Sequence, residues 1–240
     1  MWNNQVSATR HSNEKGFISS PETFYSQYSQ DRSLENCIFR GLKNGIFMDV
    51  GAHDGVDLNN TLFFETTHNW SGVNIEPIKD VYDRLVTNRP KCINLNLAVS
   101  DTDGKEEFLS HVGYTEMLSG LKSEYDKRHI ERIEREQKVM GGKSETIIVE
   151  TKTIETICDE HNIKHIHYLS IDVEGGELKV LKSINFRKVF IDVIGFENNY
   201  NDKRPEDLLS GYGYVKLPHH YGDIFMIHKE SPFYNALLTA

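Results

Sequence analysis

The sequence predicts an α/β fold built on a doubly wound, mostly parallel sheet. Short apolar runs alternate with helix-compatible segments, which is typical of strands that are buried on both faces. These runs are residues 46–50, 72–76, 92–96, 166–171 and 189–196. The first ends in Asp49, Val50 and the glycine Gly51. A strand that breaks into a glycine turn and then a helix is the ligand-binding corner of such a sheet.

Length and composition limit the class of protein. The 240 residues suit one domain, and 38% hydrophobic and 26% charged residues are globular values. The net charge of -9 argues against a nucleic-acid partner. Cys37, Cys92 and Cys158 are widely spaced, which indicates free thiols in a reducing, cytoplasmic compartment. Because no run approaches the roughly 18 apolar residues of a membrane helix, we expect no membrane span.

The chain begins with a polar segment, residues 1–21, which we expect to be a loose arm. Residues 22–240 form the predicted domain. Apolar residues in 22–39 recur at helical spacings and predict a broken helix that caps the sheet or the pocket.

Glycines shape the corner after the first strand. Gly51 and Gly55 allow a tight turn and the close approach of a ligand, and residues 56–65 are compatible with a helix. Glu76 closes the second strand 25 positions after Gly51. An acid at this place can accept hydrogen bonds from both ribose hydroxyls of an adenosine cofactor.

The remaining elements follow in order. Residues 98–101 form a loop where an adenine ring would lie. Residues 111–143 depart from the alternation, and their charged helix at 121–140 is either a solvated surface helix or a lid or dimer arm beside the active site. The other predicted helices are 80–88, 153–161 and 177–181, the additional short strands are 105–109 and 146–150, and the tail at 208–228 forms an antiparallel pair.

Four acids stand at or near the ends of predicted strands: Asp49, Glu76, Asp172 and Glu197. Each alone could be a helix cap or a surface charge. Together they would lie along one rim of the sheet, where their burial is costly without partners. S-adenosylmethionine supplies such partners, because it carries a sulfonium, an ammonium and two ribose hydroxyls.

A nicotinamide dinucleotide is the rival cofactor. Its G-x-G-x-x-G fingerprint brings the backbone close to a pyrophosphate. Here His53 stands at the second glycine position. That bulky residue argues against a pyrophosphate but leaves room for a methionine moiety.

The chain resembles the FkbM-type S-adenosylmethionine-dependent methyltransferases from about residue 24 to residue 228. The similarity lies in the combination and order of several motifs. These are Tyr28-Ser29-Gln30-Asp31, Asp49-Val50-Gly51-Ala52-His53-Asp54-Gly55, Ile75-Glu76-Pro77, Ala98-Val99-Ser100-Asp101, Ser170-Ile171-Asp172-Val173-Glu174-Gly175 with Glu177, and Glu197-Asn198-Asn199. His53 departs from the family, which often has Asn there.

The resemblance implies a class I, Rossmann-like methyltransferase fold, with a seven-stranded sheet closed by a C-terminal antiparallel hairpin. It also implies O-methylation, commonly of a hydroxyl on a sugar or a secondary metabolite. By motif position, the turn would line the methionine part of the cofactor, Asp49 would lie near its ammonium, and Asp172 would face the methyl group. The other expected cofactor-binding residues are Gly51, Ala52, His53, Asp54, Gly55, Asn59, Glu76 and Pro77, with Ala98 by the adenine.

Methyl transfer to a hydroxyl needs alignment of the reactants and a general base. We expect Asp172 to be that base, with Glu174, Glu197 or His53 as alternatives. Asp172, Glu197 and Asn198 could instead gather around Mg²⁺, a route that we do not favour. The histidines His165, His167, His219 and His220 form no zinc-binding pattern.

Other hypotheses stay open. Tyr114 and Tyr221 could stack on a sugar, and the other loop and hairpin tyrosines are expected to serve in packing. The chain could be a non-catalytic module that binds S-adenosylmethionine, or could methylate an RNA hydroxyl, which its acidic charge disfavours. A homodimer is possible.

Overall fold

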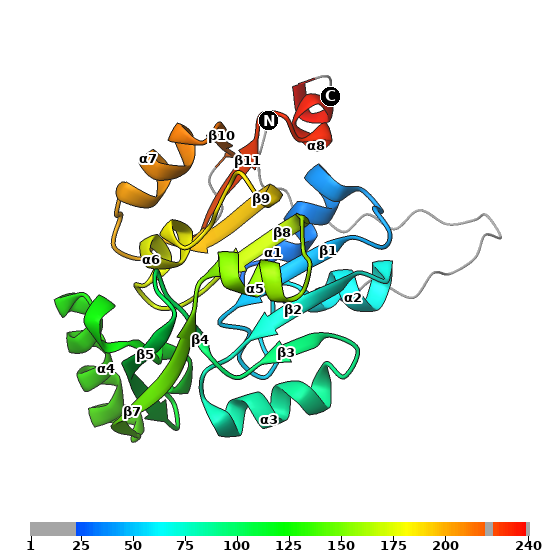
Figure 1. The fold of residues 1–240 in the computed structure, drawn as a ribbon. Helices are drawn as coiled ribbons and strands as arrows, with labels where there is room; N and C mark the ends of the chain where they lie inside the picture. Colours follow the sequence, from blue (N-terminus) through cyan, green and yellow to red (C-terminus); the bar gives the residue numbers. More distant parts are fainter. Residues whose placement is uncertain (1–22, 219–222, 239–240) are drawn as a thin grey trace, which may run out of the picture.

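A seven-stranded sheet runs through the centre of the molecule in the computed structural model, which describes residues 23–218 and 223–238 (Figure 1). Its strand order is β10-β11-β9-β8-β1-β2-β3. The strands are β1 (Ile46–Val50), β2 (Ser71–Ile75), β3 (Ile93–Leu95), β8 (His165–Ile171), β9 (Phe190–Glu197), β10 (Tyr214–Lys216) and β11 (Asp223–His228). Strand β11 pairs antiparallel with both β10 and β9, and the other neighbouring strands of this sheet pair in parallel. The predicted doubly wound class I sheet and its C-terminal hairpin are confirmed.

Helices cover both faces of this sheet. Side chains of α5 (Ile154–Glu160), α6 (Glu177–Lys182) and α7 (Arg204–Gly211) share one core with Met48 and Val50 of β1. The other face packs against α1 (Gln30–Leu34), the π-helical turn η1 (Glu35–Phe39), α2 (Leu62–His68) and α8 (Pro232–Leu238), and this second core contains Phe47. Because side chains alternate along a strand, Asp49 shares the face of Phe47.

A second, four-stranded sheet stands beside the main one, at the lower left of Figure 1. Its order is β4-β7-β5-β6, with bounds Ala98–Val99, Lys143–Lys152, Gly104–Val112 and Gly120–Leu121. The helix α4 (Lys127–Met140) and the 3₁₀ turns η2 (Glu116–Leu118) and η3 (Lys122–Glu124) belong to the same region. The strands predicted at 105–109 and 146–150 are parts of β5 and β7, which pair with each other.

Two helices begin later than the sequence predicts, because polar side chains bind the backbone before them. Asn59 Oδ1 accepts from the amides of Thr61 (2.9 Å) and Leu62 (2.8 Å), so the helix expected from residue 56 starts at Leu62. Asp126 caps α4 by accepting from the Arg128 amide (2.8 Å), so that helix starts at Lys127 instead of residue 121.

Other boundaries also differ from expectation. Helix α3 spans Lys79–Asn88, close to the prediction, whereas the broken helix expected at 22–39 is limited to α1 and η1. Helices α7 and α8 were not predicted. The expected polar arm lies outside the described residues.

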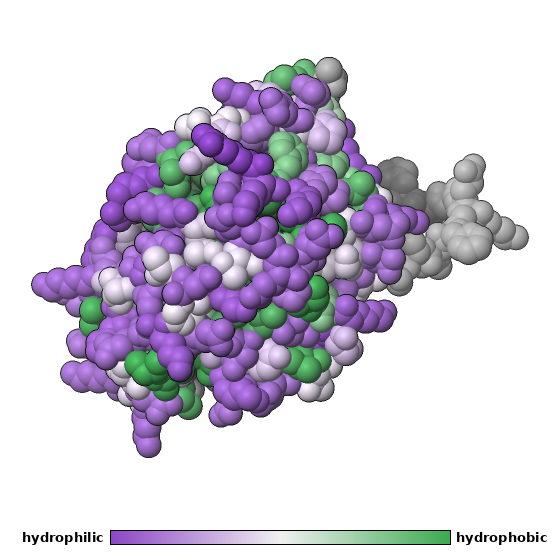
Figure 2. Space-filling view, in the orientation of Figure 1, coloured by the Kyte–Doolittle hydropathy of each residue, from purple (hydrophilic) through white to green (hydrophobic). Residues whose placement is uncertain are grey.

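Polar side chains dominate the face in Figure 2, with small apolar areas between them. No helix in the described ranges is long and apolar enough to cross a membrane. The three cysteines are free, and Cys158 is buried.

Gly51 directly follows β1 and lies against the backbone that follows β8. Its φ is +85°, and a Cβ built on it would lie 1.8 Å from the backbone oxygen of Asp172. The amide of Asp172 donates to the oxygen of Val50 (2.9 Å), which joins the two strand ends. The neighbouring strand therefore requires glycine here, whether or not a ligand is bound.

We expect Gly51→Ala to separate these strand ends. Gly41→Ala is the matched control, because Gly41 has φ +84° and open space around it. The control variant measures the cost of backbone strain alone. Gly51→Ala should lose ~1–3 kcal/mol more unfolding free energy than the control, because its Cβ also clashes with the backbone of Asp172. Urea unfolding measures both variants, and equal losses would contradict the requirement.

Candidate functional site

One cavity of about 500 Å³ opens at the carboxyl ends of β1, β2, β8 and β9. It lies at the point where the strand order reverses, the usual ligand site of an open α/β sheet, and its volume suits a cofactor. The predicted site residues that line it are Asp49, Gly51, Ala52, His53, Asn59, Glu76, Pro77, Ala98, Asp172, Glu174 and Glu197.

Three other predicted residues, Asp54, Gly55 and Asn198, do not line this cavity. Asp54 accepts from two following amides and shapes the turn. A Cβ on Gly55 would meet Leu85 and Arg89 side-chain carbons at 2.6 Å, so Gly55 allows α3 to pack. Asn198 exchanges two hydrogen bonds with the Asp202 backbone.

A buried polar network fixes the turn from beneath. Asp49 Oδ2 accepts from Asn59 Nδ2 (2.9 Å) and Thr61 Oγ1 (2.8 Å). The fully buried Arg89 donates to Asn59 Oδ1 (3.0 Å) and Thr61 Oγ1 (3.2 Å), and it pairs with Glu65. Burial raises the pKa of Asp49, and the Arg89 charge opposes that rise. Arg89 was not predicted, since nothing in its local sequence marks it as buried.

The ends of the cavity differ in polarity. Apolar side chains line one end and suit an aromatic ring; they belong to Ile78, Leu97, Ala98, Val99, Phe108 and Leu121. Next to Ile78, the buried Glu76 accepts from the Ile78 amide (2.8 Å). Burial raises the pKa of Glu76 to about 7, and hydrogen bonds from the Ile78 and His53 amides oppose this.

Three cavity-lining residues carry a buried polar atom that has no hydrogen-bond partner in the described chain: His53 Nδ1, Asn60 Oδ1 and Glu174 Oε2. Buried polar atoms in native proteins are nearly always hydrogen-bonded. Unpartnered atoms on the wall of one cavity therefore indicate a polar ligand. Asn60 was not among the predicted residues, although it follows Asn59 directly.

A cluster of carboxylates lies at the ends of β8 and β9. Carboxylate oxygens of Asp172, Glu174 and Glu197 lie within 4.8 Å of one another. Asp172 is open to the cavity but lies deep in the protein, so burial and the nearby charges of Glu197 and Glu174 raise its pKa well above the usual range. Burial raises the pKa of Asp223 to about 6 and that of Glu177 to about 7 beside them.

The region formed by the second sheet, α4, η2 and η3, here called the accessory region, closes one side of the cavity. His53 Nε2 and Glu116 Oε1 are 2.9 Å apart, and Arg84 of α3 also pairs with Glu116. From α4, the half-buried Arg132 and its partner Glu136 reach the cavity (Nε–Oε1 2.9 Å). The lid expected around residues 111–143 stays a prediction, but this region supplies part of the wall.

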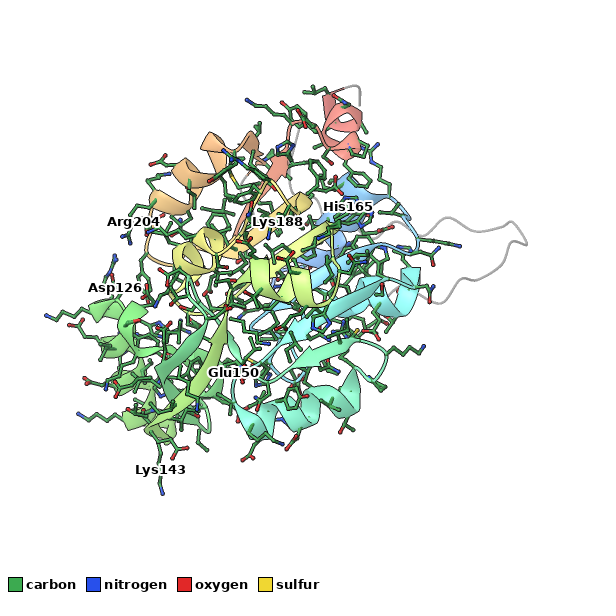
Figure 3. All side chains as sticks on the ribbon, in the orientation of Figure 1. Asp126, Lys143, Glu150, His165, Lys188 and Arg204 are labelled. Carbon is green, nitrogen blue, oxygen red and sulfur yellow. The ribbon has the colours of Figure 1, made fainter. Side chains whose placement is uncertain are left out.

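A second cavity of about 350 Å³ adjoins the first, and Glu197 and Asn199 line both. Tyr200 lines the second cavity, with Arg128 4.6 Å above its ring. Asp126 and Arg204, which also line it, lie at the left of Figure 3.

His165 and His167 do not line the first cavity. His165, His167 and Asp192 form another possible ligand group, at the other end of β8. Its members already have partners: Asp192 accepts from Ser231 Oγ (2.6 Å) and contacts His165 Nε2 (2.6 Å), and His167 Nδ1 accepts from the Ile46 amide (3.0 Å). His219, His220 and Tyr221 lie outside the described residues.

We expect the Arg89 network to be essential for stability. Arg89→Met leaves the carboxylate of Glu65, whose side chain is only 12% exposed, without its cation, so unfolding free energy should fall by about 3–5 kcal/mol. Arg84→Met, which removes a half-exposed arginine of the helix that precedes Arg89, should cost no more than about 1 kcal/mol. Similar losses of unfolding free energy in the two variants, measured by urea unfolding, would contradict a dominant contribution of the Arg89 network to stability.

Glu76 should make stability depend on pH. Its carboxyl keeps a proton in the folded protein up to a pKa of about 7, whereas the unfolded chain loses it near 4.5. The folded state therefore binds more protons in that window, and its stability should fall as pH rises from 4.5 to 7. Glu76→Gln should remove up to about 3 kcal/mol of this fall.

Unfolding at pH 5, 6 and 7 without ligand measures this slope. Glu145→Gln on the exposed part of β7 is the control and should keep the wild-type slope. An unchanged slope in Glu76→Gln would disprove the assignment.

The family described as the methyltransferase FkbM domain matches residues 49–216. No curated protein matches the chain. Among solved structures, the methyltransferase FkbM of Methylobacillus flagellatus KT is similar at 14% identity and a TM-score of 0.45, covering 78% of this chain. The present chain spans 44% of that protein.

Two other similar structures have bound ligands. The fibrillarin of Aeropyrum pernix, with S-adenosyl-L-methionine, has 11% identity and a TM-score of 0.41, covering 89% of this chain and 85% of its own. The O-methyltransferase of Bacillus cereus, in complex with SAH, has 9% identity and a TM-score of 0.38. The match covers 86% of this chain and 84% of that protein.

Proposed function

Because the chain belongs to the methyltransferase FkbM domain family, we propose that it is an S-adenosylmethionine-dependent O-methyltransferase whose acceptor is a carbohydrate hydroxyl. The main support is the change in polarity along the wall of the 500 Å³ cavity. The wall is apolar at one end, then carries Glu76, and then carries the carboxylate cluster. That order corresponds to the adenine, ribose and sulfonium of the donor.

The residues present fit this donor. An adenine ring would pack on Ala98 and Phe108, and its ribose hydroxyls would donate to Glu76. Both Asn59 and Thr61 already donate to Asp49, which therefore holds the turn, whereas Asn60 Oδ1 has no partner in the described chain and would accept from the ammonium. Asp49 contributes negative charge nearby.

S-adenosylmethionine supplies a methyl group on a positively charged sulfur. In the proposed reaction, Asp172 orients the acceptor hydroxyl and takes its proton as the oxygen–carbon bond forms and the carbon–sulfur bond breaks. A carboxylate whose pKa is raised is a stronger base once ionised. Glu174 and Glu197 are the nearest alternatives, whereas His53 Nε2 already contacts Glu116.

Polar and aromatic surroundings favour a sugar acceptor. Tyr114 lines the main cavity with 62% of its surface exposed, and Tyr200 lies in the adjoining cavity, so either ring could stack on a sugar face. A secondary metabolite, an RNA hydroxyl and a non-catalytic role are the alternatives. A homodimer and a cytoplasmic location stay predictions.

Replacing Asp172 by Asn should separate chemistry from binding. We expect methyl transfer to fall at least about 100-fold through loss of the general base. The affinity for S-adenosylhomocysteine should change only a few-fold. Titration calorimetry and transfer of a labelled methyl group measure the two quantities, and Asp80→Asn, on the exposed side of α3, should match wild type in both. Full activity in Asp172→Asn would refute its role.

A screen of acceptors tests the function itself. Purified protein with labelled donor is offered simple glycosides, small hydroxylated metabolites and RNA. Methylated glycoside supports the proposal. Labelled RNA or labelled metabolite would contradict the carbohydrate acceptor and would identify the other class instead. Tight donor binding without any product would favour the non-catalytic module.

A further inference from the structure

We propose that Asp172, Glu174 and Glu197 together bind one divalent metal ion of the Mg²⁺ or Ca²⁺ type. Its role beside the acceptor depends on the proposed function, but the ion site itself is defined by the three carboxylates. They come from the end of β9 and from the turn that follows β8.

The geometry suits a single ion. One carboxylate oxygen from each residue lies within 4.8 Å of the other two. Oxygens bound to a common Mg²⁺ or Ca²⁺ at about 2.0–2.6 Å can be separated by no more than about 5 Å. Three carboxylates without nitrogen or sulfur donors favour these hard cations over zinc.

Glu174 provides an independent observation. Its side chain lines the cavity, the residue is only 8% exposed, and Oε2 has no hydrogen-bond partner in the described ranges. Its φ of +56° is unusual for a residue with a side chain. A buried carboxylate oxygen that is held in this way without a donor is suited to a cation.

The neighbouring His129 does not provide a donor to Glu174. His129 Nδ1 lies 3.6 Å from Glu174 Oε2. His129 Nε2 is 3.1 Å from the carbonyl oxygen of Leu118, so Nε2 carries the ring proton. Nδ1 of the neutral ring then accepts from the Tyr200 hydroxyl at 3.0 Å and has no hydrogen to give to Glu174.

The nearby positive charge is insufficient. Arg132 is the cation on α4 that reaches this cavity, and it is already paired with Glu136. A divalent ion would offset two of the three carboxylate charges and would stabilise negative charge that develops on an acceptor oxygen. Asn198, which the sequence suggested as a ligand, is engaged by the Asp202 backbone, and Glu174 takes its place.

Titration with Mn²⁺, followed by electron paramagnetic resonance, tests the site. Protein is stripped with a chelator, dialysed and titrated with and without S-adenosylhomocysteine. We expect one Mn²⁺ per chain, displaced by Mg²⁺. Glu174→Gln and Glu197→Gln should each weaken Mn²⁺ binding at least 10-fold, whereas Glu134→Gln on the exposed face of α4 should not. Two variants are used so that one can fail to fold without loss of the test.

The outcomes separate this inference from the proposed function. The ion site is overturned if the wild type binds no stoichiometric Mn²⁺. It is also overturned if Mn²⁺ binds equally to the wild type and to a folded Glu174→Gln or Glu197→Gln variant. The second result would indicate another site, such as His165, His167 and Asp192. Failure to bind S-adenosylhomocysteine counts against the proposed function, and the Mn²⁺ titration still decides the ion site.

Discussion

The structure depends on how carboxylates are accommodated at the carboxyl rim of a parallel sheet. Removing a carboxylate from water is unfavourable unless hydrogen bonds or cations replace the solvent. At β1 the chain supplies them itself, since Asn59, Thr61 and Arg89 surround Asp49. At β8 and β9 it does not, because the acids outnumber Arg132, the arginine of α4 that lines this cavity.

This contrast separates the structural acid from the acids that are available to ligands. Asp49 is bonded within the protein and stabilises the glycine turn. Glu76 and the cluster around Asp172 have strongly raised pKa values, which is common at functional sites. The same rim therefore combines a rigid glycine turn with acidic groups that a positively charged or hydroxyl-bearing ligand would stabilise.

The main sheet could be predicted because each buried strand is a short apolar run, and the ends of these runs identify the cavity wall. The accessory sheet could not be predicted in full. The nine paired positions between β5 and β7 depend on contacts across some 40 residues, and more than half of their side chains are polar. Arg89 was missed because burial of an arginine depends on tertiary partners, here Glu65 and Asn59. Glu174 could be named from the sequence, but only the structure shows that Glu174 Oε2 is buried without a partner while Asn198 is bonded to the Asp202 backbone.

The most direct test of this account is the number of protons released when the donor product binds. Calorimetry with S-adenosylhomocysteine at pH 6.5, with chelator and in two buffers of different ionisation enthalpy, gives that number. Glu76 should ionise when the ribose hydroxyls donate to it, so the account predicts net proton release that Glu76→Gln reduces. Equal binding heats in the two buffers, or net proton uptake, would contradict it.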